Sequence, residues 1–271
     1  MDAPETIRFS LTVQYDGAAF HGWQVQPDQR TVQGVLQETL GRLGDRPCSV
    51  IGSGRTDTGV HATGQVASAD MPAPWTASAL LRSLNAMLPD DVRVASVCAA
   101  QPDFHPRYDA VARTYEYRIG SSADAASPFH RRWCWPLPDP LDEALLNSAA
   151  SALPGRHSFA AFAKAGQPER GEECTVHAAT WSQWSHGPRF TITADRYLHH
   201  MVRYLVGTMV DIARGRRPLS ELTRLLEKDP ELTTSPPAPP EGLFLSHVEY
   251  PDSVLLGEDA QPSQTRSTAP A

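Results

Sequence analysis

The chain has 271 residues, a length that can bury a substantial core in one large domain or two modest ones. Its formal net charge of −7 argues against a protein that coats itself in nucleic acid through bulk charge alone, although it does not exclude RNA as a partner. No apolar run approaches the roughly 18 residues that span a bilayer, and the N-terminus lacks the apolar stretch of a signal peptide, so we expect a cytoplasmic protein without membrane contact.

Hydrophobic periodicity predicts alternating strands and helices through the first part of the chain. Apolar and polar residues alternate from Ile7 to Tyr15, as in a half-buried strand. Thr31 precedes apolar residues at helical spacing, which predicts an N-cap and a helix that ends at Gly44. A short strand at 49–51, a helix over 76–89 and a strand over 92–97 are expected next.

The same patterns continue through the second part. They predict a strand over 113–119, a helix over 141–153, a hairpin from 181–184 and 190–194, helices over 197–214 and 220–228, and a last strand over 243–248. Strands often follow strands without an intervening helix, which favours an α+β fold with a largely antiparallel sheet. We expect an extended, stiff connector at the proline-rich 235–240 and a disordered tail after about residue 251.

A glycine-bounded loop with the sequence GRTDTGVHA occupies residues 54–62. Its glycines release the backbone from the preceding short strand and leave Asp57 at the tip of the loop, beside Arg55. The pattern fits a reactive loop that presents one carboxylate. It also fits an ordinary turn in which Asp57 caps the backbone and Arg55 is its solvated partner.

This loop is one of a series of motifs that together resemble the TruA family of tRNA pseudouridine synthases. The others are YDGAAFHGWQ at 15–24, TVQ at 31–33, LNAMLP at 84–89, FHPR at 104–107, RTYEYR at 113–118, His199 with MVR at 201–203, and GL at 242–243. Their order and spacing are similar to those of the family from about Arg8 to Tyr250. Thr58 stands where the family usually has alanine, and ECTVH at 173–177 lacks the arginine expected after the valine.

The resemblance implies a pseudouridine synthase fold, with two related α/β-sandwich lobes at 1–108 and 109–250 and a central active-site cleft between them. Residues 251–271 are then a disordered tail. It implies that uridines at positions 38, 39 and 40 of the tRNA anticodon stem-loop are isomerised to pseudouridine by a homodimer. The base is detached, turned and rejoined through carbon without redox or energy input, so no cofactor is implied.

The resemblance also assigns roles to individual residues. Asp57 begins the reaction as an ionised carboxylate, either by adding to the uracil ring or by assisting glycosidic cleavage, and the sequence does not distinguish the two routes. Arg203, at the margin of the apolar stripe of its predicted helix, is the expected cationic partner, unless it is a surface residue paired with Asp211. Tyr115 is expected to stack on the uracil and relay a proton, although a core position is the usual place for a strand tyrosine.

Two further residues are expected to bind substrate. Arg55 would hold the flipped nucleotide or fill the place it leaves, and Leu243 would lie across the site after the proline-rich connector. The abundance of arginine supports RNA binding, because Lys164 and Lys228 are the only lysines and a guanidinium suits phosphate recognition. Arginines gather at 107–118, 131–132 and 214–217 among aromatic residues, a pattern compatible with a groove that follows the RNA backbone or with solvated surfaces.

Two other classes of protein are weighed against this interpretation. A metal-dependent hydrolase could use Asp57, His61, His199 and His200, but adjacent histidines on a helix point about 100° apart and could not serve one ion. The four cysteines also lack the paired spacing of a zinc site, so no metal centre is expected. A non-catalytic RNA-binding module would have no need for a carboxylate loop beside Arg203.

Overall fold

The computed structural model of the chain describes residues 6–164 and 171–256. The first group of elements comprises β1 (Thr6–Tyr15), α1 (Val32–Gly44), β2 (Val50–Gly52), β3 (His61–Pro72), α2 (Ala77–Met87) and β4 (Val92–Ala100). Thr31 caps α1, as the sequence predicts, and Thr76 caps α2; each side chain accepts a hydrogen bond from a backbone amide in the first turn.

The second group begins with β5 and is longer. It comprises β5 (Ala112–Gly120), β6 (Trp135–Pro136), α3 (Glu143–Ser151), β7 (Gly155–Ser158), β8 (Glu173–Trp184), β9 (Gly187–Ala194), α4 (Met201–Ala213), α5 (Ser220–Leu226), β10 (Leu243–Glu249) and β11 (Leu255–Leu256). Short 3-10 helices occupy Gly17–Ala19, Ala123–Ala126, Arg131–Trp133, Ala160–Phe162, Pro240–Gly242 and Asp252–Val254. None of the helices in these described ranges has the length and hydropathy of a membrane-spanning segment.

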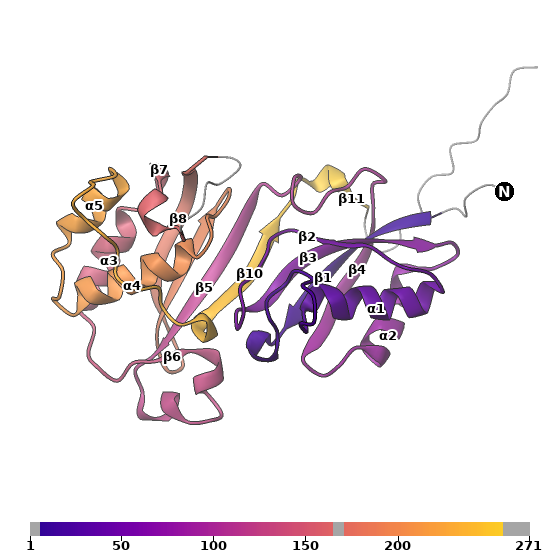
Figure 1. Cartoon of the computed structure of the whole chain (residues 1–271), viewed down its shortest axis with the longest axis horizontal. Helices are drawn as coiled ribbons and strands as arrows, with labels where there is room; N and C mark the ends of the chain where they lie inside the picture. Colours follow the sequence, from indigo (N-terminus) through magenta and orange to yellow (C-terminus); the bar gives the residue numbers. More distant parts are fainter. Residues whose placement is uncertain (1–5, 165–170, 257–271) are drawn as a thin grey trace, which may run out of the picture.

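The strands form one sheet, in which the described residues contribute eleven strands in the order β11-β4-β1-β3-β10-β5-β9-β8-β7, with β2 added to β3 and β6 to β5. The β10–β3 and β5–β6 pairs are parallel and the other pairs are antiparallel. This confirms the predicted α+β class with a largely antiparallel sheet. Figure 1 shows β5 and β10 side by side in the middle of the molecule, with helices to either side.

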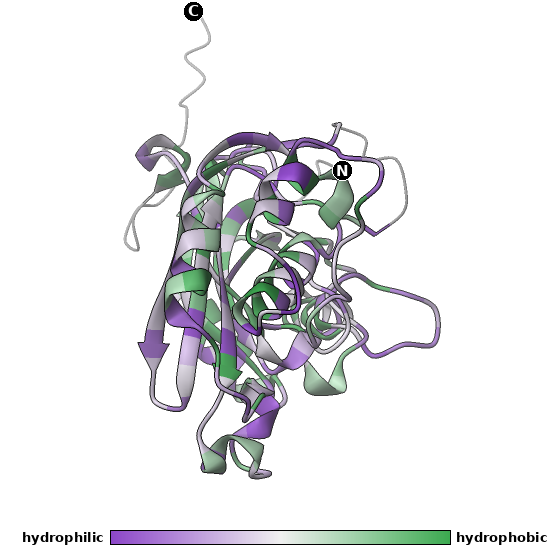
Figure 2. Cartoon of the chain, turned by 90° about the vertical axis from the view of Figure 1, so that its left-hand side faces the viewer, coloured by the Kyte–Doolittle hydropathy of each residue, from purple (hydrophilic) through white to green (hydrophobic). Residues whose placement is uncertain are grey.

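The helices cover one face of the sheet, as Figure 2 shows with the strands at the left and most helices to their right. The pattern of β1 explains why: Phe9, Leu11 and Val13 are buried on alternate positions, whereas the residues between them are polar. On this face the buried residues form two apolar cores, one under α1 and α2 and one under α3, α4 and α5. Their existence is compatible with two lobes, while the boundary near residue 108 stays a prediction.

Strands β5 and β10 join the two cores. Leu243, at the start of β10, belongs to the core under α4, whereas Leu245 and Val248 belong to the core under α1. Tyr115 on β5 packs against both cores. The two halves of the molecule are therefore connected through shared strands rather than through a flexible linker.

Helix α4 begins four residues later than the periodicity predicts. His200 adopts left-handed backbone angles, with φ 66° and ψ 4°, and stands at the N-cap position, so 197–200 precede the helix. The apolar spacing continues through Leu198, which is buried, and this is why the pattern could not reveal the break. The prediction that His199 and His200 lie on a helix was therefore wrong.

The C-terminal part of the described chain is more ordered than expected. The connector has no regular secondary structure over 235–239, and Pro240 already belongs to a 3-10 helix. It is packed: Ser235 and Ala238 are buried, and Gly207 of α4 lies under Pro236. After Pro251 a 3-10 helix leads into β11, which pairs with β4. The predicted disordered tail is therefore wrong for 252–256, and its remainder, 257–271, lies outside the described residues.

Candidate active site

Asp57 lies in the loop between β2 and β3, and its backbone is held from several sides. The hydroxyls of Tyr15 and Thr56 are 2.7 Å apart, and Trp23 donates its backbone N–H to Thr56 O at 3.0 Å. A Cβ atom on Gly22, which has φ +82°, would lie 2.5 Å from Thr56 O, so only glycine permits this approach. The 15–24 motif therefore supports the loop rather than adding a reactive group.

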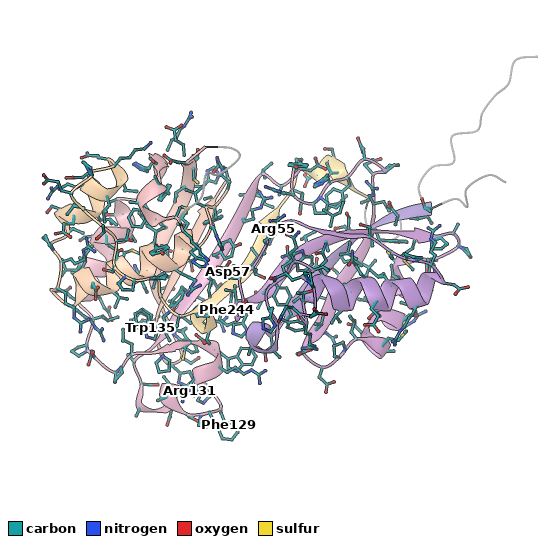
Figure 3. The ribbon with its side chains drawn as sticks, viewed as in Figure 1. Arg55, Asp57, Phe129, Arg131, Trp135 and Phe244 are labelled. Atoms are coloured by element: carbon teal, nitrogen blue, oxygen red, sulfur yellow. The ribbon has the colours of Figure 1, made fainter. Side chains whose placement is uncertain are left out.

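The carboxylate of Asp57 faces residues that begin α4. Oδ1 lies 3.2 Å from Nε2 of His199, and Oδ2 lies 3.2 Å from Nε2 of His200 and 3.8 Å from Nη1 of Arg203. Arg203 also donates from Nε to Ala238 O at 2.7 Å, which fixes the guanidinium. Asp211 pairs with Arg216 instead, so the alternative of an Arg203–Asp211 surface pair is wrong. Figure 3 shows Asp57 in the middle of the molecule.

The three donor groups of Asp57, His199 and His200 all lie within 4.8 Å of one another. The sequence analysis expected these two histidines to point about 100° apart on a helix, and this expectation was wrong. His199 and His200 precede the helix and their rings converge, with centroids 4.2 Å apart. Burial lowers the pKa of His200, against the opposing effect of the Asp57 carboxylate. His61, the fourth candidate ligand, is fully buried elsewhere and accepts a hydrogen bond from Gly17 N at its Nδ1.

Tyr115 reaches the same region from β5. A Cβ atom built on Gly54 would lie 3.9 Å from the Tyr115 hydroxyl, which places that hydroxyl beside the loop that carries Asp57. The ring also makes an edge contact with Tyr197, with centroids 4.8 Å apart. Burial raises the pKa of Tyr115 to about 12, so its phenol is neutral near pH 7. Tyr117 is fully buried and donates its hydroxyl to Pro239 O, which places it in the core.

Two residues, Gln65 and Arg113, hold the loop in place in roles that the sequence did not predict. Gln65 on β3 is fully buried, donates to Gly54 O at 2.9 Å and accepts from the Ser53 hydroxyl at 2.7 Å. The Arg113 guanidinium donates to Ser53 O at 3.0 Å and to Asp195 O at 3.1 Å, and burial lowers its pKa. A buried glutamine in a central strand is a signal that sequence reasoning could have used.

The two other residues predicted to bind substrate, Arg55 and Leu243, differ in their exposure to solvent. Arg55 is exposed on the loop, as a contact with a bound nucleotide requires. Leu243 is only 5% exposed and packs in the core, so its surface for a substrate is small. Both substrate-binding roles stay predictions.

The third predicted arginine group is occupied by internal ion pairs. Arg214 pairs with Asp139, Arg216 with Asp211, and Arg217 with Glu221 at 2.7 Å. This group therefore offers less free positive charge than its sequence suggests.

Comparison with known proteins identifies the class of this site. The family profile described as tRNA pseudouridine synthase matches residues 11–109 and 149–251. The chain belongs to this family, and it is therefore an isomerase that forms pseudouridine in tRNA.

The relatives narrow the class to tRNA pseudouridine synthase A. Proteins of that name from Solibacter usitatus and Latilactobacillus sakei are each 38% identical, over 246 and 248 residues, which cover 90% of this chain and 99% of theirs. The Bacteroides fragilis protein of the same name is 36% identical over 254 residues, which cover 92% of this chain and 98% of its own. The resemblance inferred from the motifs is confirmed over nearly the whole chain.

Proposed function

We propose that this enzyme converts uridine to pseudouridine at positions 38, 39 and 40 of the tRNA anticodon stem-loop, with Asp57 as the reactive carboxylate. The observation that carries the proposal is the contact of the Asp57 loop with the start of α4. It brings the carboxylate to Arg203 across the two halves of the molecule. An anion beside a fixed cation stays ionised, as both routes of attack require.

The neighbouring residues have distinct roles in this proposal. Arg203 pairs with the carboxylate and orients it, Tyr115 stacks on the uracil and relays a proton, and Arg55 contacts the nucleotide that has left its helix. Leu243 closes the site from the connector side. Because tRNA positions 38 to 40 differ in sequence context, recognition rests on RNA shape and backbone more than on base edges.

The proposal extends to assembly and location. The active form is a homodimer that cradles the RNA, and it acts in the cytoplasm. A net charge of −7 is compatible with binding a polyanion, because only the surfaces that meet the RNA need to be basic.

Pseudouridine mapping of unmodified tRNA treated with the pure protein tests the activity and the positions. Asp57→Asn should keep the fold and tRNA binding while losing turnover, because the amide is nearly isosteric but cannot act as an anionic nucleophile or base. Thr58→Ala, a change at the next and exposed loop position, is the matched control and should react normally. Near-wild-type pseudouridine formation by the Asn variant would exclude Asp57 as the reactive group.

A further inference from the structure

Asp57, His199 and His200 form a compact donor set at the active site. The distances between Nε2 of each histidine and the nearer carboxylate oxygen are both 3.2 Å. A tetrahedral zinc ion with bonds of roughly 2.0–2.1 Å holds neighbouring donor atoms about 3.3 Å apart. These two separations match that value, although each histidine approaches a different carboxylate oxygen. All the donor atoms lie within 4.8 Å of one another, so a small rotation of the side chains brings them around one zinc ion.

The backbone explains how two consecutive histidines come to point at one place. His200 is one of four non-glycine residues with positive φ in the described chain. Its left-handed conformation turns the chain between His199 and the first turn of α4, so both rings reach the same carboxylate. Left-handed backbone angles are uncommon for a residue that carries a side chain. Asp57 comes from the opposite side, on the loop after β2.

Accessibility and chemistry agree with this geometry. The His199 side chain is 56% exposed, which leaves a path from solvent, whereas those of His200 and Asp57 are 18% and 24% exposed. Two imidazoles and one carboxylate are a donor set used in zinc sites that keep a fourth, open position. The Arg203 guanidinium, 3.8 Å from Oδ2, opposes a cation and should weaken binding without blocking the three donor atoms.

We propose that a divalent transition-metal ion such as Zn²⁺ binds reversibly to Asp57, His199 and His200 and inhibits the enzyme. The bound ion takes the lone pairs of the carboxylate that would otherwise attack or assist the substrate. The inhibitory part of this inference rests on the proposed role of Asp57. The binding part does not, because it depends on the three donor groups alone.

The first experiment measures binding without RNA. Titration of the purified protein with Co²⁺ should produce the visible absorption bands of a tetrahedral ion at one equivalent per chain, and Zn²⁺ should displace it. His199→Ala and His200→Ala should each weaken binding about tenfold or more, and Asp57→Asn should do so as well. His177→Ala, at an exposed position on β8, is the matched control and should bind as the wild type does. Absence of these bands, or equal binding by the His199 and control variants, would overturn the site.

The second experiment measures inhibition as the ratio of turnover with and without Zn²⁺ for each variant. Wild type and the His177 variant should lose activity and recover it with a chelator. The His199 variant, changed at an exposed side chain and therefore expected to fold, should need about tenfold more Zn²⁺. Equal inhibition of the His199 variant and wild type would refute the inference. Retained turnover in Asp57→Asn would instead refute the proposed mechanism, while the Co²⁺ result would stand.

Discussion

The surroundings of the Tyr115 phenol determine which chemistry this side chain can perform. Burial raises its pKa to about 12, with Arg113 acting in the opposite direction, so the group remains protonated over the range in which enzymes normally work. A neutral phenol cannot accept a proton without passing its own onward. Tyr115 is therefore suited to stacking and to proton relay, and not to action as a phenolate base.

Two substitutions at Tyr115 separate these roles. Tyr115→Phe keeps the ring and should bind tRNA normally, yet turn over roughly 10²–10⁴-fold more slowly if the hydroxyl relays a proton. Tyr115→Leu should also weaken RNA binding, by about the 1–3 kcal/mol of base stacking. Single-turnover rates and filter binding measure the two effects.

The pH profile gives an independent check on Tyr115. Because its raised pKa keeps the phenol protonated until about pH 12, wild-type turnover should show no ionisation of Tyr115 between pH 7 and about 10. A rate that rises tenfold per pH unit toward pH 10 in wild type, but not in Tyr115→Phe, would contradict the relay and indicate a phenolate.

Arg203 is the second residue whose environment allows a sharp prediction. Arg203→Met keeps much of the side-chain volume but removes both the charge near Asp57 and the hydrogen bond to Ala238 O. We expect kcat to fall roughly 10²-fold, as when one preorganised electrostatic contact is lost, with α4 still folded by circular dichroism. Arg224→Met on α5, which removes an arginine paired with Asp229, is the control. Equal activity of the two variants would place Arg203 outside the mechanism.

At the scale of elements, sequence patterns predicted α1, α2 and β4 well because caps and apolar spacing act locally. They did not predict β3, whose middle is alanine and serine and whose burial comes from its neighbours β1 and β10. The site shows the same division: the Asp57 loop could be found from its glycines and its family motif. The convergence of His199 and His200 could not, because it depends on one left-handed residue that no spacing encodes.

The connector over α4 gives a prediction at this scale. A Cβ atom on Gly207 would lie 2.1 Å from Pro236 O, so Gly207→Ala must displace the connector that receives the Arg203 hydrogen bond. We expect a loss of stability of about 1–3 kcal/mol and reduced turnover. Gly44→Ala in α1, where a Cβ would meet its nearest neighbour at 3.5 Å, is the matched control. Urea denaturation of both variants measures the difference, and equal midpoints would show that the connector yields freely.

For the whole molecule, the two groups proposed to act together come from different halves: Asp57 from the loop after β2, and Arg203 from α4. Their relative position depends on β5 and β10, which lie between the two cores and contribute residues to both. A chain of this length can unfold in stages. The shared strands instead favour one cooperative unit, because losing either core exposes side chains, such as Tyr115, that pack on the other.

Leu84→Ala tests this cooperativity. Leu84 is fully buried in the core under α2, so its truncation should cost about 2–5 kcal/mol. If the two halves unfold together, the free energy of opening measured by hydrogen exchange should fall by the same amount for the slowest amides of α4 and of α2. Leu225→Ala, at a fully buried position of α5, is the reciprocal change and should lower protection in α2 equally. If Leu84→Ala leaves the hydrogen-exchange protection of α4 unchanged, the two lobes open independently. The distance between Asp57 and Arg203 would then be set by the substrate and not by the folded sheet.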